Sequence, residues 1–566
     1  MRWLVATAAL LLVAWPLLGD PTLALADPLS ELPVRLFVYE RVPWLGGVVD
    51  AIGFPRSGPL NDPDPLGSAF TAVLRPLLGR VGAYDAWVLT NLLATLLATW
   101  ALGRVVIDDE RSHAPMFGAV AFTLTPLALV YGVAGAVVDL LALWPWALCA
   151  RSCILAWRHA RRADQALAGL WAAVGFVASP YHLVVFTSLG LPALMVGAWT
   201  SRRSWSGGEP GPTAAARWTA LVVGGLTFVA IAGPYAWHLR AVMDDPSSQM
   251  STAAVSASRH TWPFPLLHPD HTHRYTAFLA DYVAVGKGTL IERVAASRFY
   301  RAFSPGILLF GAAGAGWVLS RAARPWLAFA AFAALASTGP YAPLTGGLAL
   351  PWPVNPAWWA LHVFPGGALL LEPFRYALPA ALALAMAGTV GVHALARRYG
   401  AWVPIVATVA WSAELIALSP VPFPLPTARV EVPSLYAQLS DLPPGAVLEL
   451  PYFDRGTDRF DRAHFLHQLV HGRPIPDEVL GFVPGWLTEN QFTAALLNVE
   501  KPSGALGVSV DATRIDADRA RFVEAGFALV VLTEARARHP EQLRALLAPF
   551  GAPVLEADGR AVWVVR

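Results

Sequence analysis

Apolar segments long enough to cross a membrane recur through residues 1–420. A helix needs about 20 apolar residues to span the hydrocarbon core of a bilayer. Eleven segments meet or nearly meet this length: 3–19, 84–103, 115–133, 136–157, 166–179, 181–199, 218–238, 304–320, 325–343, 375–396 and 401–419. Only 14% of the residues are charged, against about 25% in a typical soluble domain. The sequence therefore predicts a mainly α, polytopic transmembrane helical bundle of about 11 spans.

The arginines between these segments predict which side of the membrane each connecting loop faces. Cytoplasmic loops of membrane proteins collect Lys and Arg, and with Met1 inside the cell every short basic turn falls on the cytoplasmic side. Those turns carry Arg104 and Arg111; Arg158, Arg161 and Arg162; Arg202, Arg203 and Arg217; Arg321 and Arg324; and Arg397 and Arg398. The alternate turns at 131–135 and 179–182 carry neither Lys nor Arg. An odd number of spans then places the residues after 420 outside the cell.

The first apolar segment has a second interpretation. Arg2, the apolar run and the small residues Ala24-Leu25-Ala26 ahead of Asp27 are also typical of a cleavable signal peptide. Cleavage there would leave the later topology unchanged.

The sequence divides at a run of prolines. Residues 1–420 form the predicted transmembrane domain, with long outward loops at 20–83, 239–303 and 344–374, and residues 421–427 form a stiff proline-rich linker. Beyond it, strand patterns at 447–450, 528–532 and 561–565 alternate with helical ones. We expect residues 428–566 to form a soluble extracytoplasmic α/β domain. The sequence contains neither a G-x-G-x-x-G motif nor a P-loop, so nucleotide binding has no support. It also has no basic stripe, so nucleic acid binding has no support.

The first outward loop is rich in carboxylates. Asp27 and Glu31 follow the first span four residues apart, so a helical continuation would put them on one face. Asp62 and Asp64 lie in a second acidic group, Asn61-Asp62-Pro63-Asp64-Pro65. A carboxylate at the membrane surface can act as a general base on an acceptor hydroxyl, so these four residues are the catalytic candidates. The alternative is an ordinary polar loop, because Asp-Pro pairs form turns.

Two groups of histidines have residue types that suit a transition metal. His268, Asp270, His271 and His273 lie in the second outward loop, too closely spaced to close a tetrahedral site alone. His464, His467 and His471 share one helix face, where a solvated face or a packed histidine near Asp454 and Asp458 is the favoured interpretation. We therefore expect no metal and no cofactor, with a divalent metal as the alternative.

Two further features bear on ligands. Trp358 and Trp359 in the third outward loop have faces that can stack on sugar rings, and the alternative is that they anchor the chain at the membrane interface. Asp139 lies at the start of the fourth span, and an ionisable residue inside a membrane is a functional candidate by default.

Several short motifs follow one another in a familiar order. They are Ala26-Asp27-Pro28-Leu29; Gly53-Phe54-Pro55-Arg56-Ser57-Gly58-Pro59-Leu60; Gly82-Ala83-Tyr84-Asp85-Ala86-Trp87; Ser337-Thr338-Gly339-Pro340; Glu372-Pro373-Phe374-Arg375-Tyr376; Leu448-Glu449-Leu450-Pro451; and His471-Gly472-Arg473-Pro474. This order resembles bacterial membrane proteins of the GT-C glycosyltransferase type, including YfhO-like and mannosyltransferase-like proteins.

The resemblance implies a site and its ligands. Proteins of this type transfer a sugar from a polyprenyl-phosphate donor at the outer membrane face, and their key acidic residue lies in the first extracytoplasmic loop. Asp27 matches that position best, and Asp64 is the second candidate. Arg375 lies where a late arginine would meet the donor phosphate, which suits the guanidinium fork. The alternative for Arg375 is an anchor that extends to the headgroups.

The expected protein is therefore a multi-pass enzyme of a bacterial inner membrane. Its partners would be a polyprenyl-phosphate-linked sugar, membrane lipid, and a glycan, lipid or protein acceptor in the cell envelope. Two other functions stay open at this point. One is a transporter or flippase for a lipid-linked glycan, although no inverted repeat is evident. The other is a non-catalytic scaffold for envelope assembly that binds a partner through its α/β domain.

Overall fold

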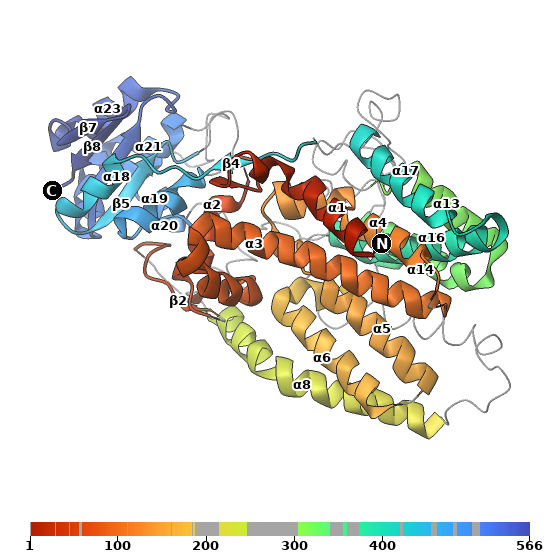
Figure 1. Ribbon diagram of the computed structural model, residues 1–566. Helices are drawn as coiled ribbons and strands as arrows, with labels where there is room; N and C mark the ends of the chain where they lie inside the picture. Colours follow the sequence, from red (N-terminus) through yellow and green to blue (C-terminus); the bar gives the residue numbers. More distant parts are fainter. Residues whose placement is uncertain are drawn as a thin grey trace. The chain divides into compact units, whose positions relative to one another are not determined.

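A computed structural model describes most of the chain, and its contacts divide it into two compact units (Figure 1). Unit 1 comprises Met1–Ser30, Pro63–Ala236 and Thr261–Arg429, and unit 2 comprises Glu31–Asp62, Trp237–His260 and Val430–Arg566. The described residues are 2–28, 30–44, 46–55, 59–60, 62–109, 111–159, 161–183, 185–186, 214–245, 304–339, 355–358, 373–418, 423–453, 461–478, 484–500 and 510–566.

The apolar part of the chain is helical. Its described α-helices are α1 (Arg2–Ala14), α3 (Pro65–Ile107), α4 (Ala114–Thr123), α5 (Trp144–His159), α6 (Arg162–Ala178), α8 (Ala214–Asp244), α13 (Ile307–Leu319), α14 (Arg324–Ser337), α16 (Ala377–Tyr399) and α17 (Val403–Leu418). Shorter turns join them: η1 (Trp15–Leu18), η2 (Ala128–Ala134), η3 (Val138–Leu141), η7 (Arg321–Ala323) and η9 (Pro373–Tyr376). Each expected span overlaps one of these helices, except 181–199, which lies mostly outside the described residues.

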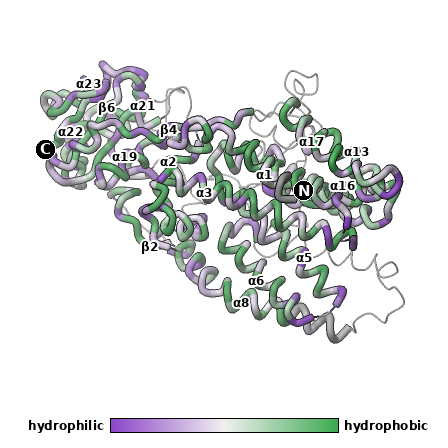
Figure 2. Tube along the Cα trace, viewed as in Figure 1, coloured by the Kyte–Doolittle hydropathy of each residue, from purple (hydrophilic) through white to green (hydrophobic). Residues whose placement is uncertain are grey.

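Several of these helices are long and apolar enough to cross a membrane. Within the described residues they are Pro65–Ile107, Val138–His159, Val222–Asp244 and Phe374–Tyr399, and Figure 2 shows hydrophobic residues along α5, α6 and α8. A fifth crossing is possible by length if α4 and η2 form one broken span, which bends by 51°. The protein is therefore a multi-pass membrane protein with a mainly helical fold. The total of eleven crossings stays a prediction.

The helices of unit 1 approach closely through small residues. A Cβ placed on Gly391 of α16 would lie 1.9 Å from the backbone oxygen of Ala312 in α13. A Cβ on Gly316 would lie 2.7 Å from the backbone oxygen of Ala387. Only glycine fits at such positions, and close backbone contact is the usual way in which helices associate in a membrane. α16 is thereby fixed in the centre of the bundle, with most of its residues buried.

The first outward loop ends in a kinked helix. α3 begins at Pro65, and at Gly79 its backbone leaves the helical conformation with a φ of 70°, which glycine adopts without strain. The part of α3 after the kink contains the predicted span 84–103.

Unit 2 is built on a four-stranded sheet. β5 (Ala446–Leu450) pairs in parallel with β6 (Phe527–Thr533), which pairs antiparallel with β8 (Arg560–Val564), and β8 pairs with β7 (Leu555–Ala557) at the other edge. All residues of β5 and β6 are buried. The expected strands 447–450 and 528–532 lie within β5 and β6, and the expected strand 561–565 overlaps β8. The described helices of this unit are α2 (Leu32–Arg41), α18 (Leu435–Gln438), α19 (Ala463–His471), α20 (Gly485–Glu489), α21 (Gln491–Glu500), α22 (Ile515–Glu524) and α23 (Pro540–Leu547).

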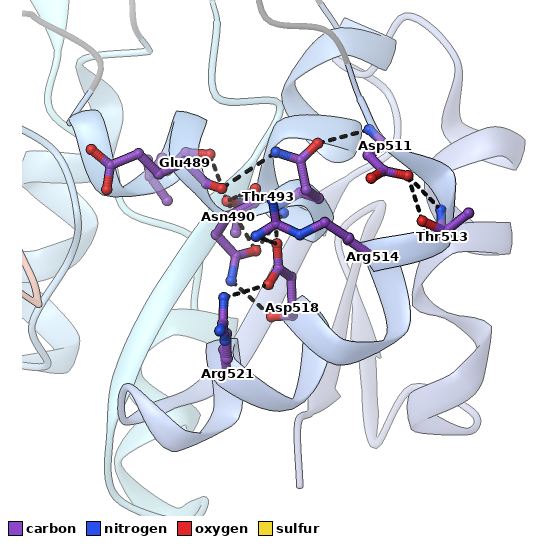
Figure 3. Close-up of polar contacts among 10 residues, drawn as sticks. Glu489, Asn490, Thr493, Asp511, Thr513, Arg514, Asp518 and Arg521 are labelled. Atoms are coloured by element: carbon purple, nitrogen blue, oxygen red, sulfur yellow. Dashed lines mark hydrogen bonds and ion pairs between the residues drawn. The ribbon is translucent and has the colours of Figure 1, made fainter.

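A buried carboxylate joins two of these helices. Asp518 of α22 accepts a hydrogen bond from the backbone N–H of Gln491, the first residue of α21, at 2.8 Å (Figure 3). The same carboxylate lies 3.1 Å from Arg521 and 3.6 Å from Arg514. A negative charge at the N-terminus of a helix is stabilising, so Asp518 fixes α21 against α22.

A segment of the first outward loop completes the other edge of the sheet. Val447 of β5 donates a backbone hydrogen bond to Pro474 at 2.9 Å, and Ile475 donates to Ala51 at 3.0 Å. Phe54 donates to Ile475 at 3.2 Å, and Gly53 to Asp477 at 3.0 Å. Residues 51–54 therefore continue the backbone hydrogen bonding outward from β5. A small hairpin, β2 (Gly47–Val48) with β3 (Pro59–Leu60), encloses this segment.

Candidate functional site

A π-helical turn in unit 1 contacts both the segment after the first predicted span and the segment that leads into α16. η2 follows Pro126, which has no backbone N–H, and α4 ends just before it at Thr123. The backbone oxygen of Ala134 in η2 accepts a hydrogen bond from the Asp27 N–H at 2.7 Å. The Tyr131 ring of η2 stacks on Phe374 at 5.3 Å, next to Arg375. Asp27 and Phe374, the residue before Arg375, thus both contact the same seven-residue segment, and π-helical turns are frequent at functional sites.

Arg375 forms a buried ion pair with Asp139. Arg375 Nη1 lies 3.4 Å from Asp139 Oδ2, and the two side chains are 9% and 4% exposed. The guanidinium lies over the ring of Tyr181, with its carbon 4.4 Å from the ring centre. Ser179 Oγ donates to the same Asp139 oxygen at 3.5 Å. Such a buried, oriented cation differs from an anchor that extends toward the headgroups, which was the alternative interpretation of this arginine.

Asp27 is held in place by its neighbours on both sides. Leu25 donates its backbone N–H to Asp85 Oδ1 of α3 at 2.8 Å. β1 (Leu23–Ala24) pairs antiparallel with β4 (Ala428–Arg429). Asp27 itself is half-buried, and its backbone oxygen accepts from Ser30 at 2.9 Å. The described residues between 27 and 31 form a turn, so Asp27 and Glu31 do not share a helix face there.

Asp64 caps α3. Its Oδ1 accepts from the backbone N–H of Gly67 at 3.0 Å, and its Oδ2 accepts from Trp87 Nε1 at 3.0 Å. The residue is fully buried. A Cβ on Gly67 would lie 2.2 Å from the Asp64 carboxylate, so this position requires glycine. Both oxygens of this catalytic candidate therefore have structural partners.

The other two acidic candidates belong to unit 2. Glu31 precedes α2 and forms an ion pair with Arg462. Asp62 is fully buried. The four candidate carboxylates consequently do not form one cluster: Asp27 and Asp64 lie in unit 1, whereas Glu31 and Asp62 lie in unit 2.

The structure describes only one of the two candidate tryptophans, Trp358. Trp358 is buried, and its backbone N–H donates to Asn355 Oδ1 at 3.3 Å. Asn355 also donates to the backbone oxygens of Leu335 and Gly339, both at 2.7 Å. Trp359 lies outside the described residues, as do His268, Asp270, His271 and His273.

The histidines of α19 are buried, so the face that they share is not solvated. His467 Nδ1 lies 2.6 Å from Glu449 Oε2, and Tyr436 donates its hydroxyl to the same oxygen at 2.6 Å. His464 Nδ1 lies 3.0 Å from Asp477 Oδ1. Of the two expected alternatives, a solvated face and packed histidines, the structure shows packed histidines. Their partners are Glu449 and Asp477. Asp454 and Asp458 lie outside the described residues.

Carboxylates shift the pKa values in this cluster. Asp477, Glu449 and Asp461 oppose the effect of burial on His464 and raise its pKa to about 10. The neighbouring histidines hold the pKa of Glu449 well below its usual range despite burial. Among the described residues, no group of three or more His, Cys, Asp and Glu side chains is arranged to hold a metal ion.

Three residues near the Arg375–Asp139 pair are not among the candidates that the sequence predicts. They are Ser179, Tyr181 and His182, and His182 lies within electrostatic reach of both charges. One signal was present: Ser179-Pro180 interrupts an apolar stretch, and polar residues at a break inside a membrane usually face a protein interior.

Comparison with solved structures identifies the fold. The arabinofuranosyltransferase AftD from Mycobacteria matches all of this chain with a TM-score of 0.50 at 16% identity, and the match covers 40% of the AftD chain. A variant of the same enzyme gives the same TM-score and identity over 41% of its chain. ArnT from Cupriavidus metallidurans, bound to undecaprenyl phosphate, has a TM-score of 0.41 at 15% identity, covering 100% of this chain and 97% of that one.

The sequence itself gives no such match. No protein-family model matches the chain, and no curated protein matches it. The chain spans about two fifths of the length of AftD. The likeness to AftD therefore concerns the fold alone, and it agrees with the resemblance to GT-C proteins that the sequence motifs suggested.

Proposed function

We propose that this protein is a glycosyltransferase that moves a sugar from a polyprenyl-phosphate donor to a cell-envelope acceptor. Transfer would take place at the outer face of a bacterial inner membrane, with the N-terminus of the chain inside and residues 428–566 outside. The observation that carries the proposal is that Asp27 and Phe374, the neighbour of Arg375, both contact the one turn η2, within a fold of the GT-C type. This arrangement combines a carboxylate from the first outward loop with a buried cation from a late span.

The proposed chemistry assigns one role to each group. The Asp27 carboxylate takes the proton from an acceptor hydroxyl, whose oxygen then bonds to the anomeric carbon of the sugar. The bond from that carbon to the phosphate oxygen breaks, and polyprenyl phosphate leaves with the electron pair. Arg375 meets the phosphate charge, because its planar fork suits phosphate oxygens. Asp139 and Tyr181 fix the direction in which the guanidinium points.

The remaining candidates have lesser roles in this proposal. Asp64 is second to Asp27 as the base, because its two oxygens cap α3 and bind Trp87. Asp62 and Glu31 belong to the part of the loop that lies between Asp27 and Asp64. Trp358 and Trp359 would lie near the sugar, where an aromatic face can stack.

A donor test on the purified full-length protein examines the proposal. Radiolabelled polyprenyl-phosphate sugars would be offered with a membrane-glycan extract, and arabinofuranose would be included because AftD is an arabinofuranosyltransferase. We expect transfer by the unmodified protein and a loss of about 10²- to 10⁴-fold in Asp27→Asn, the usual contribution of a general base. Arg375→Lys should lose activity too, because lysine lacks the fork.

A matched control variant distinguishes the loss of a general base from a general effect of removing a carboxylate in this loop. Asp50 is an exposed carboxylate of the same outward loop, and Asp50→Asn should keep full activity. Transfer that survives in Asp27→Asn would move the base to Asp64 or Asp62. Absence of transfer with every donor would reject the enzyme, and translocation of a lipid-linked sugar without bond formation would replace it with a flippase.

A further inference from the structure

A break in the apolar chain of unit 1 lies against the Arg375–Asp139 pair. Proline disfavours the helical conformation for the residue before it, and Ser179, which precedes Pro180, is extended with φ −157° and ψ 112°. α6 therefore ends at this point. Ser179 then donates to Asp139 and the Tyr181 ring lies against Arg375, so the break contacts both members of the ion pair.

His182 is the next side chain along this break, and it is fully buried. Its backbone N–H donates to the backbone oxygen of Ser179 at 3.0 Å, which fixes the turn. The backbone of Ala142 lies close enough to act on the imidazole, but neither ring nitrogen completes a hydrogen bond with a described residue. Buried polar groups are nearly always hydrogen-bonded, so a ring with two unsatisfied nitrogens points to a ligand or a change of charge.

Two charged groups of the described chain act on the His182 ring. They are Asp139 of η3 and Arg375 of η9, and all three residues belong to unit 1. The Phe186 ring, which meets the imidazole edge to face at 5.9 Å, adds no charge. The charges of Asp139 and Arg375 balance each other in their ion pair. An imidazolium beside that pair would be a buried charge without a counter-charge, which is costly, so His182 is neutral there.

A donor phosphate would change this balance of charge. A polyprenyl-phosphate sugar is a phosphodiester, which carries a single negative charge. The buried site would then hold two anions, Asp139 and the phosphate, against the one cation of Arg375. An unbalanced charge is costly where the dielectric constant is low. A proton on a neighbouring imidazole restores neutrality, and histidine is the side chain whose charge changes most readily near neutral pH.

We propose that His182 belongs to the donor-phosphate site and takes up one proton when the phosphate binds. The imidazolium supplies the second positive charge, and its N–H groups are donors for phosphate oxygens. The proton comes from water and returns to water when the phosphate leaves, so no other reactant is needed. The inference rests on the proposed function, because it assigns the donor phosphate to Arg375.

The test measures phosphate binding as a function of pH on the purified full-length protein. The probe is radiolabelled undecaprenyl methyl phosphate, a phosphodiester whose own charge stays constant from pH 6 to pH 9. Because a proton binds together with the phosphate, Kd should rise with pH, by up to about tenfold per pH unit. Calorimetry in two buffers of different ionisation enthalpy should show an uptake of about one proton per bound probe. A Kd that is constant over this range would overturn the proposal.

A neutral variant assigns the proton to its residue. His182→Gln keeps a polar side chain of similar size that cannot take up a proton in this pH range. We expect its Kd to be independent of pH and, at pH 6, about tenfold or more above that of the unmodified protein. A His182→Gln protein that keeps the pH dependence would overturn the assignment to His182. The profile of the unmodified protein needs no variant, so a flat profile is decisive even if His182→Gln fails to fold.

His393 provides the matched control. It lies in unit 1 toward the other end of α16 from Arg375, and its Nδ1 is 3.0 Å from Ser112 Oγ. His393→Gln should leave both Kd and its pH dependence unchanged. If His393→Gln flattens the profile as strongly as His182→Gln does, the effect is a general one and the role of His182 is rejected.

Two further outcomes separate this inference from the proposed function. A protein that binds the probe with the expected pH dependence but transfers no sugar would lose the proposed function and keep the proton uptake. Phosphatidylglycerol is also a phosphodiester, and the same concentration of it should not displace the probe. Displacement would assign the site to bulk phospholipid and overturn the donor-phosphate assignment, as would a complete absence of probe binding.

Discussion

Arg375 and Asp139 are 236 positions apart in the sequence, and their side chains form a buried ion pair with Nη1 and Oδ2 at 3.4 Å. The pair joins η9, at the start of a late span, to η3, at the start of α5. It is adjacent to the stacked rings of Tyr131 and Phe374. Two distant parts of the bundle are therefore held together by charge at the place where the first outward loop also attaches.

Removing one charge from the Arg375–Asp139 pair should lower the free energy of unfolding. Asp139→Asn leaves a buried guanidinium without its counter-charge, and breaking a buried pair typically costs about 3–5 kcal/mol. Asp139→Asn together with Arg375→Gln should recover most of that stability, because no charge then remains buried. Thermal unfolding of the purified full-length protein in lipid or detergent measures both. A double variant less stable than Asp139→Asn alone would contradict the pairing.

Asp64 and Asp27 should respond to substitution in opposite ways. Asp64→Ala removes the cap of α3 and leaves Trp87 Nε1 without its acceptor, so we expect a loss of about 0.5–2 kcal/mol or more in stability. Asp27→Asn should unfold at the same temperature as the unmodified protein while losing transfer. Thermal unfolding and the donor assay, run on the same preparations, compare the two. Equal destabilisation by both substitutions would make Asp27 a structural residue as well.

The histidine cluster of unit 2 should make stability depend on pH in the alkaline range. The pKa of His464 rises from 6.5 to about 10 in the folded protein. A raised pKa means that the folded state holds the proton more tightly, so the stabilisation is complete below about pH 6.5 and is lost as the pH rises toward 10. The unfolding temperature, measured from pH 6 to pH 10, should fall across that window. His464→Gln should flatten this dependence, and an unchanged slope in that variant would assign it to other groups.

Gly526 should be sensitive to a single methyl group. Its φ is +101°, which disfavours alanine, and the added Cβ would press on Phe54. Gly526→Ala should cost more than about 1 kcal/mol. Gly551 is the control, because its φ is +92° and nothing lies within 4 Å of its Cβ position. Thermal unfolding should show a larger loss for Gly526→Ala, and the difference measures the contact with Phe54. Equal losses would mean that residues 51–54 are not held there.

The span pattern was accessible from sequence because length and apolarity are local properties. The broken span at α4 and η2 was also accessible in principle, since Pro126 cannot donate the hydrogen bond that a continuing helix needs. The apolar pattern instead predicts one continuous segment over 115–133. The cap at Asp64 had a signal too, because an acidic residue followed by proline is typical of a helix start. That motif was interpreted as a turn.

Long-range partners had no such local signal. Nothing in the residues around Arg375 indicates Asp139 as its partner, and nothing around Glu31 indicates Arg462. The assignment of Ala51 and Phe54 to the edge of a sheet formed by residues beyond 440 is equally invisible, since they have no strand pattern. These contacts depend on how distant segments meet. The four acidic candidates lie in one loop of the sequence, but the folded chain divides them between the two units.

The sheet edge of unit 2 sets an order of events during synthesis. Ala51 leaves the ribosome long before Ile475, its hydrogen-bond partner. At about 5–20 residues per second, the intervening chain takes on the order of tens of seconds to make. Throughout that interval the segment that will complete the sheet has no sheet to join. Closure of unit 2 therefore waits until residue 475 has been made, and a ribosome that stops before that point releases a chain whose residues 51–54 have no sheet edge to complete.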